Sequence, residues 1–467
     1  MIFWWGEIMS KESKLASDSL GTAESVIMGV SGTAPGFSVA ATTAALVGAI
    51  GIHSPSSALY SGLIMFGITF SFMYLNRMST NAGASYAWIS EIFGKNWGFF
   101  AGWSLLVATA IFMVSGTIPV ATATLVLINP SLLDSPVWVS LVASFWLSFV
   151  GIIVLKGIKP TSYLQVILTL LEIGILIFII IAAFVAFIKQ PVRIIPLESF
   201  SPFSYSWELF AKGAIISLFF YWGWDVTLNL SEETKNANSS AGKGALWSMV
   251  IVTLVFVAFL MCALIALTDE EIQQSSTNVL LKLADKIFPA PWGNIALISV
   301  ILSSLGTIET SILQFTRTLF AKSRDGVLHK RWSKVHPTWQ TPWSATVLIW
   351  ALGMIFLLVA SQESSITAII DISINIISFQ VAFYYGLCGF ACAWHNRTIA
   401  FTNIKMTILV IVWPLLSAIS LVAIEIYGIF YFFDTKSIIL GIGGILVGIV
   451  PLLLNKKNSI LNFSNAK

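Results

Sequence analysis

Apolar stretches of about twenty residues or more recur along the whole chain, and they limit its possible folds more than any other feature. One of them contains "LTLLEIGILIFIIIAAFVAF" within residues 161–188. A helix of that length matches the hydrocarbon thickness of a bilayer. The composition agrees, because 10% of the residues are charged, whereas a soluble domain carries about 25%. The sequence therefore predicts an all-α integral membrane protein.

Twelve transmembrane helices are predicted, with both termini in the cytoplasm and the chain in the plasma (cytoplasmic) membrane of the cell. The helices are expected over 24–50, 56–76, 97–128, 136–155, 161–188, 209–230, 245–267, 292–321, 342–360, 365–394, 404–427 and 436–454. Basic residues favour the cytoplasmic side. This orientation places every Lys and Arg there except Lys189, Arg193, Lys212, Lys282, Lys286 and Lys436. Tails are expected over 1–23 and 455–467, and Met9 could replace Met1 as the true start.

The first predicted helix contains a stretch that is unfavourable to a helix. The stretch consists of Ser31, Gly32, Thr33, Ala34, Pro35 and Gly36. Proline removes a backbone donor and clashes with the preceding turn, and glycine loses chain entropy on ordering. At membrane depth a broken backbone is tolerated only where it faces protein or a water-filled cavity. A simple proline kink is the alternative interpretation.

The sixth predicted helix has an interruption of its own, at Phe220, Tyr221, Trp222, Gly223, Trp224 and Asp225. Breaks at corresponding places in two halves of a chain are the best sequence indication of a transporter's central site. The two stretches are therefore predicted to bind the solute. Asp225 would be the N-cap of a second half-helix over 226–235, accepting backbone N–H bonds. It could also contact a substrate ammonium group or take up a proton, and these roles are compatible.

Three segments resemble the amino acid–polyamine–organocation (APC) superfamily. They are "NAGASYAWISEIFGKNWGFFAGW", "WGWDVTLNLSEETKNA" and "TRTLFAKSRDGVLHKRWSKVHPTWQTP", and they occur in the expected order. The similarity covers roughly residues 24–400. The resemblance is specific to the superfamily and indicates no particular substrate.

The resemblance implies a LeuT-type 5+5 inverted repeat with discontinuous helices 1 and 6. A ten-helix transport core would cover 24–394, with repeats over 24–188 and 209–394, and two additional helices would occupy 395–454. By the same resemblance, the first break holds the carboxylate of an amino acid, and the second holds its amino group and side chain. Exposed N–H groups at a half-helix N-terminus do form an anion site. The local sequence "SGTAPG" departs from the commoner Gly-Ser-Gly-Ile pattern.

Ionisable residues inside membrane helices are costly, so each is a functional candidate. Glu172 stands where several relatives carry a lysine, and it could be a proton carrier or a neutral carboxyl hydrogen-bonded in a packed interface. Glu309 is followed by Thr310 and Ser311, and this group could bind sodium, which prefers oxygen ligands, or a proton. Proton coupling is the first choice, while sodium coupling and exchange without an ion stay open. Asp371 and Glu425 lie closer to helix ends, where solvation or capping is expected.

These features predict a secondary active transporter, a permease that moves amino acids by alternating access as a proton symporter. An exchanger of amino acids or polyamines, or a membrane sensor of amino acids that does not transport, are the alternatives. An enzyme is not expected, because His53, His329, His336 and His395 all fall in loops or at helix ends. The segment "ANSSAGKG" lacks the pattern of a phosphate-binding loop. The expected partners are an amino acid or amine, a proton or sodium ion, and membrane lipid, with no cofactor, metal or nucleic acid.

Overall fold

The computed structural model describes residues 14–454 except 134, 276–277, 363–365 and 401. Across these residues the regular elements are helices, and one β-bridge joins Leu20 to Thr234. The possible start sites Met1 and Met9, most of the predicted N-terminal tail and the C-terminal tail lie outside the described residues.

The helices follow one another with short connections. The first part of the chain contains α2 (Thr22–Gly32), α3 (Pro35–Ile50), α4 (Ser54–Met78), α5 (Ser85–Phe93), α6 (Lys95–Ser115), α7 (Thr117–Ile128), α8 (Pro136–Leu155), α9 (Ile158–Phe187), α10 (Trp207–Phe219) and α11 (Val226–Asn229). The second part contains α12 (Ala237–Ala266), α13 (Asp269–Ser275), α14 (Val279–Ile287), α15 (Ile295–Arg324), α16 (Trp343–Ala360), α17 (Ile366–His395), α18 (Ile404–Thr407), α19 (Trp413–Tyr431) and α20 (Thr435–Leu446).

Ten helical stretches among the described residues are long and apolar enough to cross a membrane, so the protein is a multi-pass membrane protein. One of the ten, residues 22–78, contains α2, α3 and α4 together. The helices α10 and α11 are not among the ten, because they have 13 and 4 residues.

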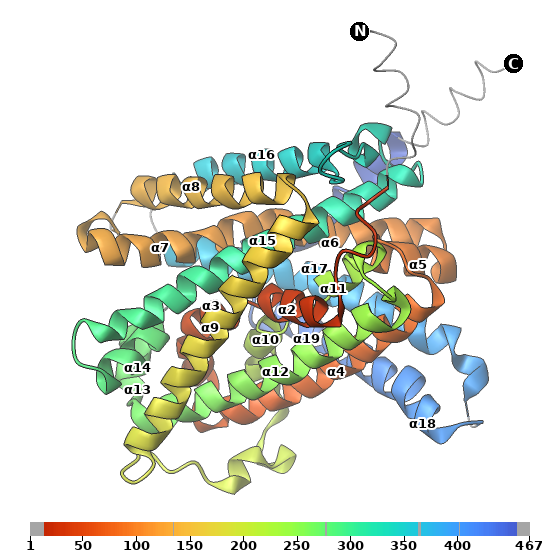
Figure 1. Ribbon diagram of the computed structural model, residues 1–467. Helices are drawn as coiled ribbons and strands as arrows, with labels where there is room; N and C mark the ends of the chain where they lie inside the picture. Colours follow the sequence, from red (N-terminus) through yellow and green to blue (C-terminus); the bar gives the residue numbers. More distant parts are fainter. Residues whose placement is uncertain (1–13, 134, 276–277, 363–365, 401, 455–467) are drawn as a thin grey trace, which may run out of the picture.

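The short helices α2, α3, α10 and α11 lie in the middle of the bundle (Figure 1). The long helices α4, α9, α12, α15 and α17 surround them, with α12 packed against both α4 and α2 and α15 packed against α9 (Figure 1). On one flank, α8 and α16 lie side by side (Figure 1). Large apolar side chains such as Phe145 of α8 and Leu170 of α9 are exposed on the outside of the bundle. This apolar outer surface suits contact with lipid tails.

Small residues permit the closest helix contacts, as is usual in membranes, where burial of apolar surface gives little driving force. Gly244 of α12 lies against Ser25 of α2, and a Cβ there would come within 2.5 Å of the serine Cβ. Gly102 of α6 lies against Tyr86 of α5 in the same way, with 2.7 Å to the tyrosine Cβ. The first of these contacts holds α2, which leads into an interrupted segment, close to α12.

Candidate functional site

The first interrupted segment is a true break between two helices and not a proline kink. Helix α2 ends at Gly32, and α3 begins at Pro35. Ala34 between them has a left-handed backbone with φ of +46°, which an L-residue seldom adopts. Pro35 occupies the first position of α3, where its missing N–H is not needed and its fixed φ suits the helix.

The second break separates α10, which ends at Phe219, from α11, which begins at Val226. Gly223 has φ of +105°, a conformation that favours glycine. The N–H groups of Gly223 and Trp224 find no acceptor within the described ranges. The backbone at this break is therefore only partly satisfied by the protein itself.

The two breaks touch each other through their glycines. A Cβ built on Gly32 would lie 2.7 Å from the carbonyl carbon of Gly223, and a Cβ on Gly223 would lie 2.7 Å from that of Gly32. Real Cβ atoms do not approach a backbone so closely. Glycine at both positions therefore lets segments almost 200 residues apart in sequence meet backbone to backbone.

Side chains of α9 and α15 cap the N-terminus of α3. The N–H of Gly36 donates to Oε1 of Glu172 at 2.9 Å, and the N–H of Phe37 donates to Oγ of Ser303 at 3.1 Å. The second carboxylate oxygen of Glu172 is buried and has no hydrogen-bond partner among the described residues. The predicted anion site at this half-helix therefore already holds a carboxylate that the protein supplies.

The C-terminal end of α2 is held by two residues that the sequence analysis did not select. Thr307 Oγ1 donates to the carbonyl oxygen of Ser31 at 2.6 Å, and Gln165 Nε2 donates to the hydroxyl of Ser31. The hydroxyl of Thr33 turns back and donates to the carbonyl of Val30 at 2.7 Å. Hydroxyl and amide side chains are common in membrane helices, so no sequence signal distinguishes Gln165, Thr307 or Ser303.

Asp225 binds two tyrosines of α17. Its Oδ2 accepts from the hydroxyl of Tyr384 and its Oδ1 from the hydroxyl of Tyr385, both at 2.9 Å. The Nε1 of Trp222 donates to the Tyr384 hydroxyl at 2.9 Å and extends this network. Asp225 does occupy the N-cap position of α11, as predicted, but two parts of that prediction are wrong: its side chain makes no capping bond, and α11 ends at Asn229 and not at residue 235. The carboxylate accepts hydrogen bonds from the tyrosine hydroxyls in place of the backbone N–H groups of α11.

Further aromatic rings pack against the residues of this network. Phe72 of α4 makes edge-to-face contacts with Trp224 and Tyr385, with ring centroids 5.2 and 5.4 Å apart. Trp222 contacts Phe112 of α6 at 5.4 Å. Both tryptophans are buried, so they are walls of the interior and not members of an interfacial belt.

The other residues of the second break point elsewhere. Phe220 packs on Phe256 of α12, and the hydroxyl of Tyr221 donates to the carbonyl of Ala58 in α4 at 2.7 Å. These two side chains therefore attach the break to α12 and α4. By contrast, Trp222, Trp224 and Asp225 contact the tyrosines of α17.

Glu309, Thr310 and Ser311 are all buried in α15. Neither carboxylate oxygen of Glu309 has a partner in the described part of the chain. The hydroxyl of Thr310 donates to carbonyls of its own helix, at Gly306 and Thr307. No hydrogen bond links these three residues to Glu172.

A sequence model of the amino acid permease family matches residues 20–453. The chain belongs to this family. The resemblance to the APC superfamily is therefore confirmed, and the protein is a transport protein and not an enzyme.

Several curated relatives of this permease are transporters. It is 26% identical to the serine/threonine exchanger SteT of Bacillus subtilis, over 66% of this chain and 67% of SteT. It is 24% identical to the low-affinity putrescine importer PlaP of Escherichia coli K12, over 65% of this chain and 66% of PlaP. It is 28% identical to the branched-chain amino acid permease BcaP of Bacillus subtilis, over 50% of this chain and 46% of BcaP. The aligned region thus spans about two thirds of the first two relatives and about half of the third.

Two arginine–glutamate pairs hold one end of the permease's interrupted helices. Arg317 of α15 binds Glu233 with two bonds of 2.9 Å, and both side chains are fully buried. Arg324, farther along α15, binds Glu232 with bonds of 2.8 and 2.9 Å at a partly exposed position. The carbonyl of Glu233 also accepts from the N–H of Leu20 at 3.0 Å, just before α2. The start of α2 and the end of α11 are thereby fastened together and to α15.

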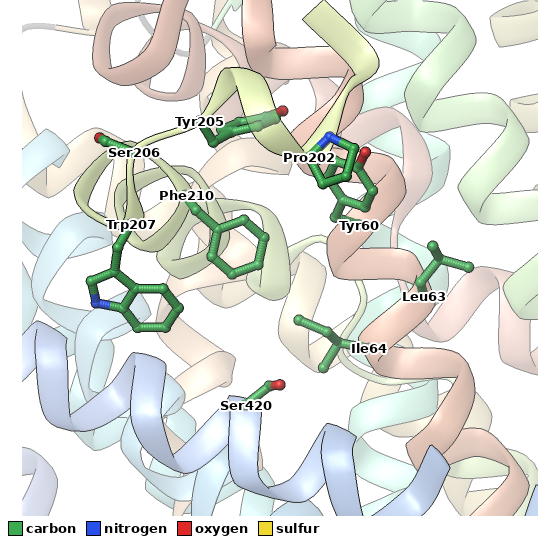
Figure 2. Close-up of a pocket in the computed structure, with 9 residues that line it drawn as sticks. All are labelled: Tyr60, Leu63, Ile64, Pro202, Tyr205, Ser206, Trp207, Phe210 and Ser420. Carbon is green, nitrogen blue, oxygen red and sulfur yellow. The ribbon is translucent and has the colours of Figure 1, made fainter. Parts of the chain in front are cut away.

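A cavity of about 480 Å³ lies away from both breaks (Figure 2). Figure 2 shows the rings of Trp207 and Phe210 from α10 directed toward Ile64 of α4 and Ser420 of α19. Its mouth is open, since Trp207 is 56% exposed. The hydroxyl of Tyr60 in its wall is already bonded to the carbonyl of Phe200. This apolar cavity shares no residue with the predicted site.

A smaller cavity of about 30 Å³, room for about one water, adjoins Trp222. Glu425 of α19 lines it and accepts a hydrogen bond from the hydroxyl of Ser378 at 3.3 Å. The expectation that Glu425 caps a helix end is wrong, because α19 continues to Tyr431 and the carboxylate accepts from Ser378 of α17. The expectation that Glu425 is solvated stays a prediction, since the residue is partly exposed and lines this cavity.

Proposed function

We propose that the protein is a secondary active transporter that carries an amino acid or a related amine across the plasma membrane by alternating access. The observation that carries this proposal is the contact of Gly32 with Gly223, where two interrupted helices meet beside buried carboxylates. Interrupted helices in both halves are what a central solute site between two moving repeats requires. The proposed solute-binding residues are the two predicted stretches, 31–36 and 220–225.

The proposed topology has twelve crossings, in two inverted repeats of five followed by two additional helices. In it, α2 with α3 forms one interrupted crossing and α10 with α11 forms the other. The remaining ten are α4, α6 with α7, α8, α9, α12, α15, α16, α17, α18 with α19, and α20. The transport core then covers 24–394 and the additional pair 395–454, between cytoplasmic tails at 1–23 and 455–467. In this orientation, the arginine–glutamate pairs close the cytoplasmic side.

Proton coupling is proposed to act through Glu172, with Glu309 as the second candidate. Glu172 accepts a hydrogen bond from the first turn of α3 through one oxygen, while the other oxygen lacks a partner. Proton uptake would weaken this bond, because a neutral carboxyl is a poorer acceptor than a carboxylate. The first break would then be free to change its position. Sodium coupling remains the alternative for Glu309 with Thr310 and Ser311.

Exchange of two solutes is a second candidate function, favoured by the similarity to the serine/threonine exchanger SteT. Uptake of labelled solute into proteoliposomes tests both functions. Accumulation driven by an inward proton gradient supports symport, and uptake that requires solute inside the vesicle supports exchange. Solute binding without either kind of uptake would contradict transport and support a sensor.

A further inference from the structure

We propose that the solute of this permease is an organic amine without a free carboxylate, and that its ammonium group binds Asp225. This inference rests on the proposed transport function and names the substrate class of the same site. Three features of the described residues support it: the occupied anion position, the balance of buried charges and the surroundings of Asp225.

The first feature is that the protein's own groups occupy the donors of the first break. The N–H groups of Thr33 and Ala34 bond to carbonyls of α2, at 3.1 and 3.0 Å. The N–H of Gly36 bonds to Glu172, and that of Phe37 bonds to a serine of α15. A solute carboxylate would therefore have to displace Glu172 or lie next to it, and two carboxylates at short distance repel each other. An amine without a carboxylate meets neither obstacle.

The second feature is a set of buried carboxyl groups that have no cationic partner. Glu172, Asp225 and Glu309 are fully buried, and none of them belongs to an ion pair formed by the described residues. Two buried cations of α15 have other partners. Arg317 binds Glu233, and the ammonium of Lys322 donates to a backbone carbonyl and lies 3.9 Å from the centre of a phenylalanine ring. Buried charge needs compensation. A zwitterion adds no net charge, whereas an amine adds a positive one.

The third feature is the environment of Asp225, which suits an ammonium group. Two tyrosine hydroxyls donate to its carboxylate, one to each oxygen, and fix its orientation. The rings of Phe72 and Trp224 pack against Tyr385, and Trp222 donates to the hydroxyl of Tyr384. Aromatic faces attract cations and also cover methylene groups. The N–H groups of Gly223 and Trp224 lie next to Asp225 in sequence. A solute carboxylate bound there would be close to the carboxyl group of Asp225, so these N–H groups are a poor position for it.

The test uses pairs of compounds that differ by one carboxylate: putrescine with ornithine, cadaverine with lysine, and tyramine with tyrosine. Binding is measured by thermal shift of the purified full-length protein, and uptake is measured in proteoliposomes. At least one amine is expected to bind and to enter at least tenfold faster than its parent amino acid.

The outcomes separate the two proposals. Uptake of an amino acid in preference to its amine overturns the substrate class and leaves the transport function intact. Binding of an amine without uptake or exchange supports the class and overturns the transport function. If no amine binds in any pair, the inference about the substrate class is wrong.

Variants of Glu172 connect the preference to its cause. Glu172→Ala frees the N–H of Gly36, so the ratio of amine to amino acid binding is expected to fall at least tenfold. Glu172→Gln is the matched control, because its amide oxygen still accepts from Gly36 and the ratio is expected to fall less. Asp225→Asn is expected to abolish amine binding. An unchanged ratio in a well-folded Glu172→Ala protein would show that the internal carboxylate does not exclude amino acids.

Discussion

The buried pair Arg317–Glu233 and the more exposed pair Arg324–Glu232 allow a test of what holds the interrupted helices closed. Both pairs are bidentate, and both join the same helix, α15, to adjacent glutamates that follow α11. Their side chains differ in exposure, at 0% for each member of the first pair against 37% for Arg324 and 23% for Glu232. The two pairs are therefore matched controls for the effect of burial.

Arg317→Met is expected to lower the free energy of unfolding by about 3–5 kcal/mol, because it leaves the carboxylate of Glu233 buried without a partner. Arg324→Met is expected to cost about 0–1 kcal/mol, because water can solvate the remaining glutamate. The double variant Arg317→Met/Glu233→Met removes both charges, and it is expected to recover most of the loss.

Denaturant titration in detergent micelles, followed by tryptophan fluorescence, measures these differences. The titrations must keep the same slope, so that the midpoints report stability. Equal losses for Arg317→Met and Arg324→Met would refute the reasoning, and so would a double variant that is less stable than Arg317→Met. Either result would mean that burial does not determine what the inner pair contributes.

Three further predictions concern the breaks and an ion pair between α13 and α14. Gly32→Ala is expected to reduce transport at least tenfold, because the added Cβ would overlap the backbone of the other break. Gly174→Ala is the control: no atom lies within 4 Å of its added Cβ, so uptake is expected to stay unchanged. Glu172→Gln is expected to abolish accumulation driven by a pH gradient in proteoliposomes; unchanged accumulation would eliminate it as the proton carrier. The hydrogen bonds from Lys286 lower the pKa of Glu271. This pair therefore stabilises the fold fully above about pH 4.3, the ordinary pKa of a glutamate, and the stabilisation disappears as the pH falls through the lowered pKa. Thermal unfolding of Glu271→Gln and the wild type should therefore differ at pH 7, by no more than about 1 kcal/mol, and converge in acid; a difference that grew in acid would contradict this sign.

The membrane class and most helix positions could be predicted from the sequence, because they follow from local chemistry. The apolar run over 161–188 has one stable form in a bilayer, a helix that satisfies its own backbone, and α9 covers Ile158–Phe187. Both breaks were located for the same reason. Glycine and proline act on their own backbone, so Pro35 and Gly223 mark interruptions wherever the rest of the chain lies.

The partners of the site could not be predicted, because they come from distant parts of the chain. Asp225 looked like a helix cap because N-terminal N–H groups lie beside it in sequence, yet Tyr384 and Tyr385 approach from α17 and take its carboxylate. The anion position of α3 looked available to a solute, and Glu172 occupies it from α9. Neither contact has a sequence signal, because each depends on which face of a helix meets the break.

The sequence by itself thus determined that the chain crosses the membrane repeatedly, where its helices are interrupted and which carboxylates lie inside. Only the tertiary structure decided how those carboxylates are satisfied: Asp225 by tyrosines, Glu172 by the backbone of α3, and Glu233 by Arg317. The physical reason is the distance along the chain over which each effect acts. Hydropathy and backbone propensity act within a few residues, whereas a buried charge is stabilised by whatever group packing brings to within about 3 Å of it.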